Sequence, residues 1–444
     1  MERYIPHTFA PIRSSMKPDR PNEISSLELS FDEIADIAKI APKELIKASM
    51  AEGDDVSRKP GLLLTKDDII NIKIYEATAL ALPYTLEDVQ VYLKFGNADD
   101  GGRGLEYKDF LNTFTQTREH ALRWAPLNDE IKLTGTKLKI FSSHMIIYGD
   151  SITDLNTGIK NAASIREYLD SNKITTLTQL KQIKVISDDN FPGITLDKGT
   201  KKDLGAYLSL IFEEVNTNLE DTKSLNTNII NFSNDLTSRV LPKIKTQLKL
   251  VSDNTVQTDT NTLKESIEER ALRIEEKNKE YTALVEKSFN AAASLNIAGL
   301  GMAIYQGVEA ENARGERNRL REEQQQEIEK LSQKNQTLAS LYRVKNELEG
   351  LQHVTFDAEA ATKNLRHVWN AILKFVQLSK ESTDHINDTV SLGLFILHFK
   401  LVVEPWRDIQ KHTDLFINIF KEADEEYKKI YTNNTQQTNH PMEL

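Results

Sequence analysis

Apolar residues recur every three to four positions along most of the chain, which is the spacing of one buried face of an α-helix. The sharpest case follows a break at Pro60 and Gly61, where Thr65 is placed to cap a helix. An apolar face then extends toward Pro83 through Ile69, Ile72, Tyr75, Ala79 and Leu82. This stretch predicts a helix that is held to a core along one side.

Helices of the same kind are predicted over most of the remaining chain. Proline removes a backbone donor and clashes with the preceding turn, so each internal proline predicts a kink or a restart. The expected helices run from Ser30 with a restart at Pro42, from Thr85 to Phe95, from Leu105 to about Val185 with a kink at Pro126, and from Lys201 to Leu248 with a kink at Pro242. The sequence therefore predicts an all-α protein.

A coiled-coil stripe begins at Ile267, Ile274 and Tyr281, which are seven residues apart. A second stripe, set among charged residues, follows later in the chain: Ile328, Leu331, Leu338, Leu341, Leu348 and Leu351. We expect the two stretches to pair as an antiparallel hairpin, whose arms of some 35 to 45 residues would reach roughly 50 to 65 Å at about 1.5 Å per residue. This hairpin would form a neck that projects from the helical bundle.

The expected organisation is an elongated helical bundle, a long antiparallel coiled-coil neck and a small apolar hairpin head. The segments are a flexible N-terminal arm over 1–28, a tail bundle built from 29–252 and 353–431, a neck built from 253–287 and 309–352, a head over 288–308, and a flexible C-terminal tail over 432–444.

The head segment, 288–308, is the one long stretch of the chain without a charged residue. Alanine is nearly neutral for membrane insertion and the segment contains Asn290, Asn296 and Gln306, so its summed insertion energy is near zero. Gly299 and Gly301 suit a turn, which would give two short arms that enter one leaflet. We expect a shallow membrane anchor.

An alternative is that this segment is a small-residue helical interface packed inside the bundle. Charged residues such as Arg314 and Arg317 follow it at once, and a charged coiled coil on both sides leaves no obvious helix to bury it. Membrane contact is therefore the favoured interpretation.

Composition narrows the function further. The net charge of −11 and the interleaving of basic with acidic residues disfavour nucleic-acid binding. The absence of cysteine removes disulfides, thiolate zinc sites and cysteine nucleophiles, and none of the nine histidines has metal-ligand spacing, so no cofactor is expected. The first twenty residues lack the apolar run of a secretory signal, so we expect export by another route.

Two other segments have competing interpretations. The run from Tyr148 to Asp154 imitates the nucleophile block of GDS-type esterases, with Ser151 as nucleophile, but the chain has no Asp-x-x-His and the flanks are helical. We expect Ser151 to be a helix-break or capping residue. The apolar run 391–403 is too short to span a bilayer and is expected in the core, as are Trp369 and Trp406.

The order of these features resembles the A subunit of the alpha-xenorhabdolysin binary toxins. The resemblance rests on RKPGLLLTKDDIINIKIYEATALALP from Arg58, LEYKDFLNTF from Leu105, the Phe191-Pro192-Gly193 break and the single uncharged hairpin tip. It implies a non-enzymatic helical pore-forming toxin subunit, soluble at first, that binds the target-cell membrane through its head. It also implies a partner B subunit that lines the pore within a hetero-oligomeric ring.

By position, the resemblance places membrane contact on the apolar residues of the head, with Gly299 and Gly301 at the turn. The expected membrane-contacting residues are Phe289, Leu295, Ile297, Leu300, Met302, Ile304, Tyr305 and Val308. The alternative from another functional class is an intracellular coiled-coil scaffold whose tip packs on a partner helix.

Overall fold

The computed structural model describes residues 31–50, 59–93, 106–155, 171, 173–174, 179, 196, 198–254, 258–293, 297–386 and 388–438. Their elements are all helices, as predicted. In chain order these are α1 (Phe31–Met50), α2 (Lys66–Leu80), α3 (Leu86–Leu93), α4 (Tyr107–Leu122), α5 (Trp124–Asp154), α8 (Lys198–Asp235), the π-helix η1 (Leu236–Val240), α9 (Leu241–Asn254), α10 (Thr258–Ala293), α11 (Ile297–Ser332), α12 (Gln336–Thr383) and α13 (Thr389–Thr438).

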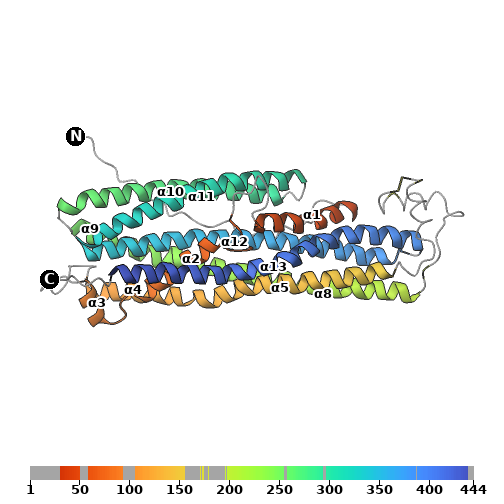
Figure 1. Ribbon diagram of the computed structural model, residues 1–444, viewed down its shortest axis with the longest axis horizontal. Coiled ribbons are helices and arrows are strands. Elements are labelled where there is room, and N and C mark those ends of the chain that lie inside the picture. Colours follow the sequence, from red (N-terminus) through yellow and green to blue (C-terminus); the bar gives the residue numbers. More distant parts are fainter. Residues whose placement is uncertain are drawn as a thin grey trace.

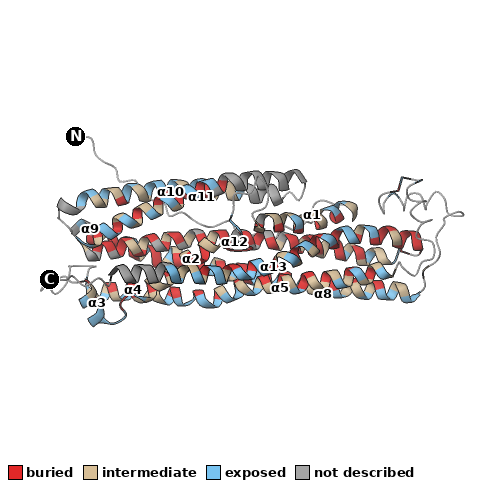
Figure 2. Ribbon diagram, viewed as in Figure 1, coloured by how far each residue is buried: buried red, intermediate tan, exposed pale blue. Residues whose placement is uncertain are grey.

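Four long helices form the centre of an elongated bundle (Figure 1). α5 packs against α8 and α13, and α12 packs against α8. α1 covers α12 and α13, and α2 packs on the same two helices nearer the end that holds α3 and α4. Buried residues follow the inner faces of these helices (Figure 2).

Three aromatic side chains occupy the middle of the bundle. The Phe141 ring meets Trp406 edge-on at 4.6 Å and Trp369 at 4.9 Å, measured between ring centroids. The two tryptophan rings stack at 5.7 Å. Each of the three is buried, so the prediction that Trp369 and Trp406 lie in the core is confirmed.

α13 is the one helix of the described residues that is long and apolar enough to cross a membrane, over Thr389–Lys429. Two thirds of its apolar window is buried inside the bundle, 67%. Phe395, Phe399 and Val402 are fully covered, whereas Lys400 is exposed. The prediction that 391–403 belongs to the core is therefore confirmed.

Thr65 caps α2 as predicted. Its hydroxyl accepts from the Asp68 backbone N–H at 3.3 Å, and the Asp68 carboxylate accepts from the Thr65 backbone N–H at 2.9 Å. This reciprocal pair is a capping box. Gly61 just before it has φ +157°, and a Cβ there would lie 2.1 Å from the Leu64 carbonyl oxygen, so the turn into α2 requires glycine.

The expected effects of proline differ from those observed at two positions. Pro42 lies inside α1 without ending it. The chain breaks at Arg123, between the end of α4 at Leu122 and the start of α5 at Trp124, three residues earlier than the expected kink. Pro126 lies in the first turn of α5, where a backbone N–H has no intrahelical acceptor, so the proline costs no helical hydrogen bond. Before Pro242 the helix widens into η1, which adjusts the backbone ladder ahead of the proline.

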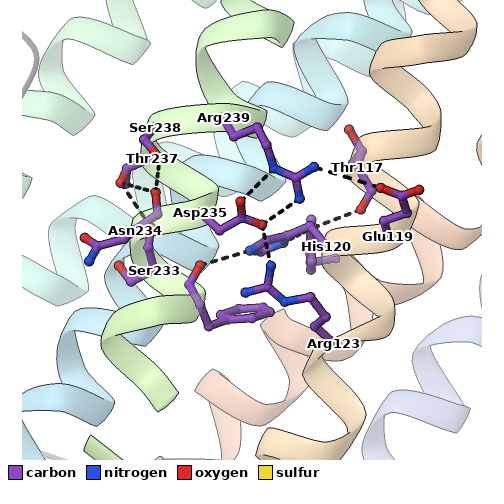
Figure 3. A network of polar contacts seen from close by, with 12 residues as sticks. Thr117, Glu119, His120, Arg123, Ser233, Asn234, Asp235, Thr237, Ser238 and Arg239 are labelled. Carbon is purple, nitrogen blue, oxygen red and sulfur yellow. Dashed lines mark hydrogen bonds and ion pairs between the residues drawn. The ribbon is translucent and has the colours of Figure 1, made fainter. Parts of the chain in front are cut away.

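A polar network that is buried at Tyr75 and His120 and reaches the surface at Arg123 joins α4 to the end of α8 (Figure 3). The His120 Nε2–H donates to the Phe232 carbonyl at 3.1 Å, and Nδ1 accepts from the Tyr75 hydroxyl at 2.7 Å. Asp235 nearby accepts from Arg123 at 2.7 Å and from Arg239 at 2.7 Å. Burial lowers the pKa of His120 to about 4, so the imidazole is neutral here.

Candidate membrane-contacting hairpin

α10 and α11 pair as an antiparallel hairpin, as the seven-residue spacing predicts. Ile267, Ile274 and Tyr281 on α10 are buried at the seam. Ile328 and Leu331 on α11 are fully covered. Each helix has 36 residues, so the hairpin is about 54 Å long at 1.5 Å per residue.

Polar side chains set the register of the hairpin. Arg270 on α10 pairs with Glu327 at 2.5 Å, and Lys277 pairs with Glu316 at 2.6 Å. The Gln324 side chain donates to the Ile267 carbonyl at 2.8 Å. The Lys277–Glu316 pair is largely exposed and adds at most about 1 kcal/mol, whereas the Arg270–Glu327 pair is more buried. Together they fix how α10 and α11 are aligned.

The uncharged head segment lies at the closed end of this hairpin. α10 ends at Ala293 and α11 begins at Ile297, so Gly299 and Gly301 lie within α11 rather than between the helices. Of the expected membrane-contacting residues, Phe289 lies on α10, Leu295 lies outside the described residues, and the other six lie on α11: Ile297, Leu300, Met302, Ile304, Tyr305 and Val308. Their side chains fall outside the described part of the chain.

The second neck arm is shorter than predicted. α11 ends at Ser332, and the Asn335 side chain accepts from the Leu338 backbone N–H at 3.0 Å to cap the start of α12. The stripe that begins at Ile328 therefore divides between two helices. Leu338, Leu341 and Leu348 belong to α12, where they are buried. The regular leucine spacing continues across Asn335, so it gave no sign that a new helix begins there.

The hairpin lies alongside the bundle. α11 packs against α12 and touches α1, and the closed end of the hairpin lies beside α1 (Figure 1). The sequence predicted a neck that projects from the bundle, whereas in this form the two helices are folded back along it.

The first described turns beyond the head are buried against the bundle. Ala310 and Ala313 on α11 form an apolar cluster with Tyr281 on α10, and Phe356 on α12 packs against it. The Tyr281 and Phe356 rings meet edge-on at 6.1 Å. Small alanine side chains let the hairpin approach α12 closely here.

Beside this apolar cluster lie five polar residues that we call the buried ionic cluster: Asp68, Tyr281, Arg314, Arg317 and Asp357. Arg314 Nη2 lies 2.5 Å from Asp68 Oδ1, and Arg314 Nε lies 3.8 Å from Asp357 Oδ2. The Tyr281 hydroxyl donates to Asp357, and the Arg317 guanidinium lies 5.6 Å from the centre of the Tyr281 ring. Two carboxylates face two guanidinium groups, so their formal charges balance.

The pKa values of the two carboxyl groups in this cluster are shifted in opposite directions. Although burial opposes its charge, the adjacent Arg314 and the Thr65 hydrogen bonds hold the pKa of Asp68 below its ordinary value. Burial raises the pKa of Asp357 to about 6 despite Arg314, helped by the nearby charge of Asp68. Burial thus disfavours the charged form of Asp357, and it likewise lowers the pKa of Arg317.

The buried ionic cluster was not predicted from the sequence. We expected Arg314 and Arg317 as charged residues that flank the head, and Asp68 only as an acidic residue that follows the Thr65 cap. The structure buries all three, at 5%, 2% and 2% exposure. The spacing of Arg314 and Arg317 places them on one helix face beside Ala310 and Ala313, which was the available signal.

The esterase-like block has a structural explanation. Ser151 lies within α5, where its hydroxyl donates to the Ile147 carbonyl at 2.9 Å, so it does not break or cap the helix. A Cβ at Gly149 would lie 2.6 Å from Val403, so the glycine allows α5 to approach α13. Among the described residues no group of three or more His, Asp or Glu could hold a metal ion.

Neither a scan of protein-family models nor a search of curated proteins finds a match to the chain. Solved structures do match. YaxA from Yersinia enterocolitica is 27% identical, with 83% of this chain and 100% of that chain covered and a TM-score of 0.44.

XaxA from Xenorhabdus nematophila is 26% identical over 83% of this chain and 99% of that chain, with a TM-score of 0.40. The XaxAB pore complex from the same organism is 26% identical over 83% and 100%, with a TM-score of 0.41. The chain is similar to toxin A subunits. YaxA and XaxA are A subunits of the alpha-xenorhabdolysin family, the family that the sequence pattern resembles.

Proposed function

We propose that this chain is the A subunit of a two-component α-helical pore-forming toxin and has no enzymatic role. It binds the target-cell membrane with the head of the α10–α11 hairpin, then recruits and stabilises a B subunit that lines the pore of a hetero-oligomeric ring. It is soluble before it reaches that membrane.

One observation carries this proposal. The only long uncharged segment of the sequence falls where α10 and α11 meet, at the closed end of an antiparallel hairpin. An apolar element at the end of two amphipathic helices can enter a lipid surface without unfolding the bundle. Its near-zero insertion energy also lets the protein remain soluble, and it suits a shallow anchor better than a pore-lining helix.

Placing charges in the head is the direct test. The double variant Leu300→Asp/Ile304→Asp is expected to bind liposomes at least about tenfold more weakly, because aspartate inserts at a cost of about 2.5–3.5 kcal/mol at the centre of a membrane helix. Cosedimentation with vesicles of neutral and anionic phospholipids measures the binding. Lysis of cells is expected only when the B subunit is added.

The matched control is Leu397→Asp/Leu401→Asp, which changes two exposed leucines on α13 at the same four-residue spacing, 46% and 45% exposed. It should bind liposomes as the unaltered protein does. Equal binding by the head variant and the unaltered protein would refute the head assignment. No lipid binding by any form, together with a soluble stoichiometric partner, would support the scaffold alternative.

A further inference from the structure

The closed end of the hairpin lies against the flank of the bundle, beside α1, and the four central helices continue past it (Figure 1). In this form the head does not project beyond either end of the molecule. A head that must enter a membrane therefore needs the hairpin to leave the bundle.

Both connections of the hairpin lie at its opposite end, where α9 leads into α10 and α11 leads into α12 (Figure 1). At one of them α11 ends at Ser332, and the Lys334 and Asn335 backbone N–H groups both donate to the Leu331 carbonyl, at 2.9 and 2.8 Å. A short turn of this kind can change its backbone angles without disturbing the helices on either side. The hairpin can thus swing out as a unit.

The buried ionic cluster supplies fully buried hydrogen bonds between hairpin and bundle, whereas those from Arg321 to Asn346 and from Tyr342 to Glu268 are partly buried. Arg314 on α11 reaches Asp68 on α2 at 2.5 Å, and Tyr281 on α10 donates to Asp357 on α12. Arg314 also donates to the Thr65 hydroxyl at 3.1 Å. Both helices of the hairpin are thereby tied to two different helices of the bundle, close to the head.

We propose that the buried ionic cluster is a latch that holds the hairpin against the bundle, and that its opening releases the head. This inference rests on the proposed function, because release matters only if the head meets a membrane.

Ionic groups suit a latch better than an apolar surface does. Buried ion pairs add little net stability because desolvation offsets their attraction, yet removing one partner is strongly destabilising because the other charge is left buried. The form in which the hairpin lies against the bundle, here called the closed form, therefore has one defined geometry but can still open. When the hairpin separates, water solvates all four charges.

The pKa of Asp357 gives the latch a pH dependence. Arg314 and Arg317 from α11, Asp68 from α2 and Tyr281 from α10 face this carboxyl group. Burial raises its pKa from the ordinary 3.8 to about 6 in the closed form, so closing takes up a proton and acidification favours the closed form. Between pH 7.5 and pH 5 the closed-to-open ratio should rise about tenfold, and Asp357→Asn should abolish that change.

Distance measurement between two spin labels tests the latch in solution without lipid. The chain has no cysteine, so cysteines introduced at Leu272 on α10 and Leu415 on α13 are labelled uniquely; these side chains are 53% and 49% exposed. The unaltered cluster should give one short, narrow distance distribution. Arg314→Met should lower the closed-to-open ratio by about a hundredfold and add a longer distance, since it leaves two buried carboxylates with one guanidinium.

Three further variants control this result. Arg319→Met removes an exposed arginine of the same helix, paired with Glu323 four residues along, and should keep the short distance. The double variant Asp68→Asn/Arg314→Met removes both charges of the pair and should restore the short distance between the labels. Tyr281→Phe keeps the ring and loses only the hydroxyl, so it should open the latch partially even if Arg314→Met fails to fold.

An Arg314→Met protein that is folded by circular dichroism and keeps the short distance would overturn the latch, as would an unchanged Tyr281→Phe protein. The proposed function is judged separately by liposome binding. Lipid binding without any hairpin release would reject the latch alone, whereas release without lipid binding would reject the membrane function and leave the latch standing.

Discussion

Replacing Trp406 by alanine is expected to lower the free energy of unfolding by about 3–5 kcal/mol. The indole is fully buried between Phe141 and Trp369 at the centre of the bundle, and alanine would leave a cavity where α5, α12 and α13 meet. Urea unfolding followed by circular dichroism measures the change. An effect below about 1 kcal/mol would show that these aromatic rings do not form the core of the bundle.

Two phenylalanine variants separate packing from hydrogen bonding. The Trp369 Nε1–H donates to the Thr222 hydroxyl at 3.1 Å, whereas the Trp406 Nε1–H has no acceptor among the described residues. Trp369→Phe should therefore cost about 1 kcal/mol more than Trp406→Phe, the net value of one buried hydrogen bond. The reverse order would contradict the assignment of partners.

Acidification is expected to destabilise the protein through His120, with a loss that approaches about 3 kcal/mol near pH 4. Burial lowers the pKa of this imidazole from 6.5 to about 4, so the unfolded chain takes up the proton first. The stability that the neutral ring provides is fully present above pH 6.5 and is lost as the pH falls from 6.5 to 4. Protonation of Asp357, whose pKa is raised to about 6, acts in the opposite direction over the same range. The His120 contribution is therefore measured as the difference in free energy of unfolding between the unaltered protein and His120→Asn, from urea titrations between pH 7.5 and 4.5.

The non-titrating variant His120→Asn is the control for this pH dependence. It should be less stable than the unaltered protein at pH 7.5, because the ring stacks on Phe232 at 4.1 Å and hydrogen-bonds to Tyr75. Its free energy of unfolding should fall less steeply with acidification. Parallel pH profiles for the two proteins would show that His120 is not the group responsible.

The sequence predicts those parts of the fold that depend on local signals. Thr65 is followed three positions later by Asp68, its capping-box partner, so the start of α2 is visible in the sequence. The seven-residue spacing of Ile267, Ile274 and Tyr281 likewise identifies the buried face of α10. The uncharged segment 288–308 is likewise visible in the sequence, because the residue types alone show that it contains no charge.

Features that depend on tertiary packing could not be read from the sequence. Leucines on both sides of Asn335 keep a heptad-like spacing, so periodicity alone joined α11 to α12 across a helix start. Arg314 and Asp68 are 246 positions apart, and only the folded chain shows that each neutralises the other. A pair of arginines on a charged helix is usually solvated, so their shared helix face with Ala310 and Ala313 was too weak a local signal to predict the docking of the hairpin.

Fluorescence from a single label in the head tests the central claim most directly. A cysteine introduced at Leu300 in this cysteine-free chain would carry an environment-sensitive dye, with a second protein labelled at exposed Leu415 on α13 as control. On addition of liposomes, the Leu300 label should shift to shorter wavelength and be quenched by lipid-attached quenchers near the bilayer surface, while the Leu415 label should not change. Lipid-bound protein whose Leu300 label stays in water would contradict the account.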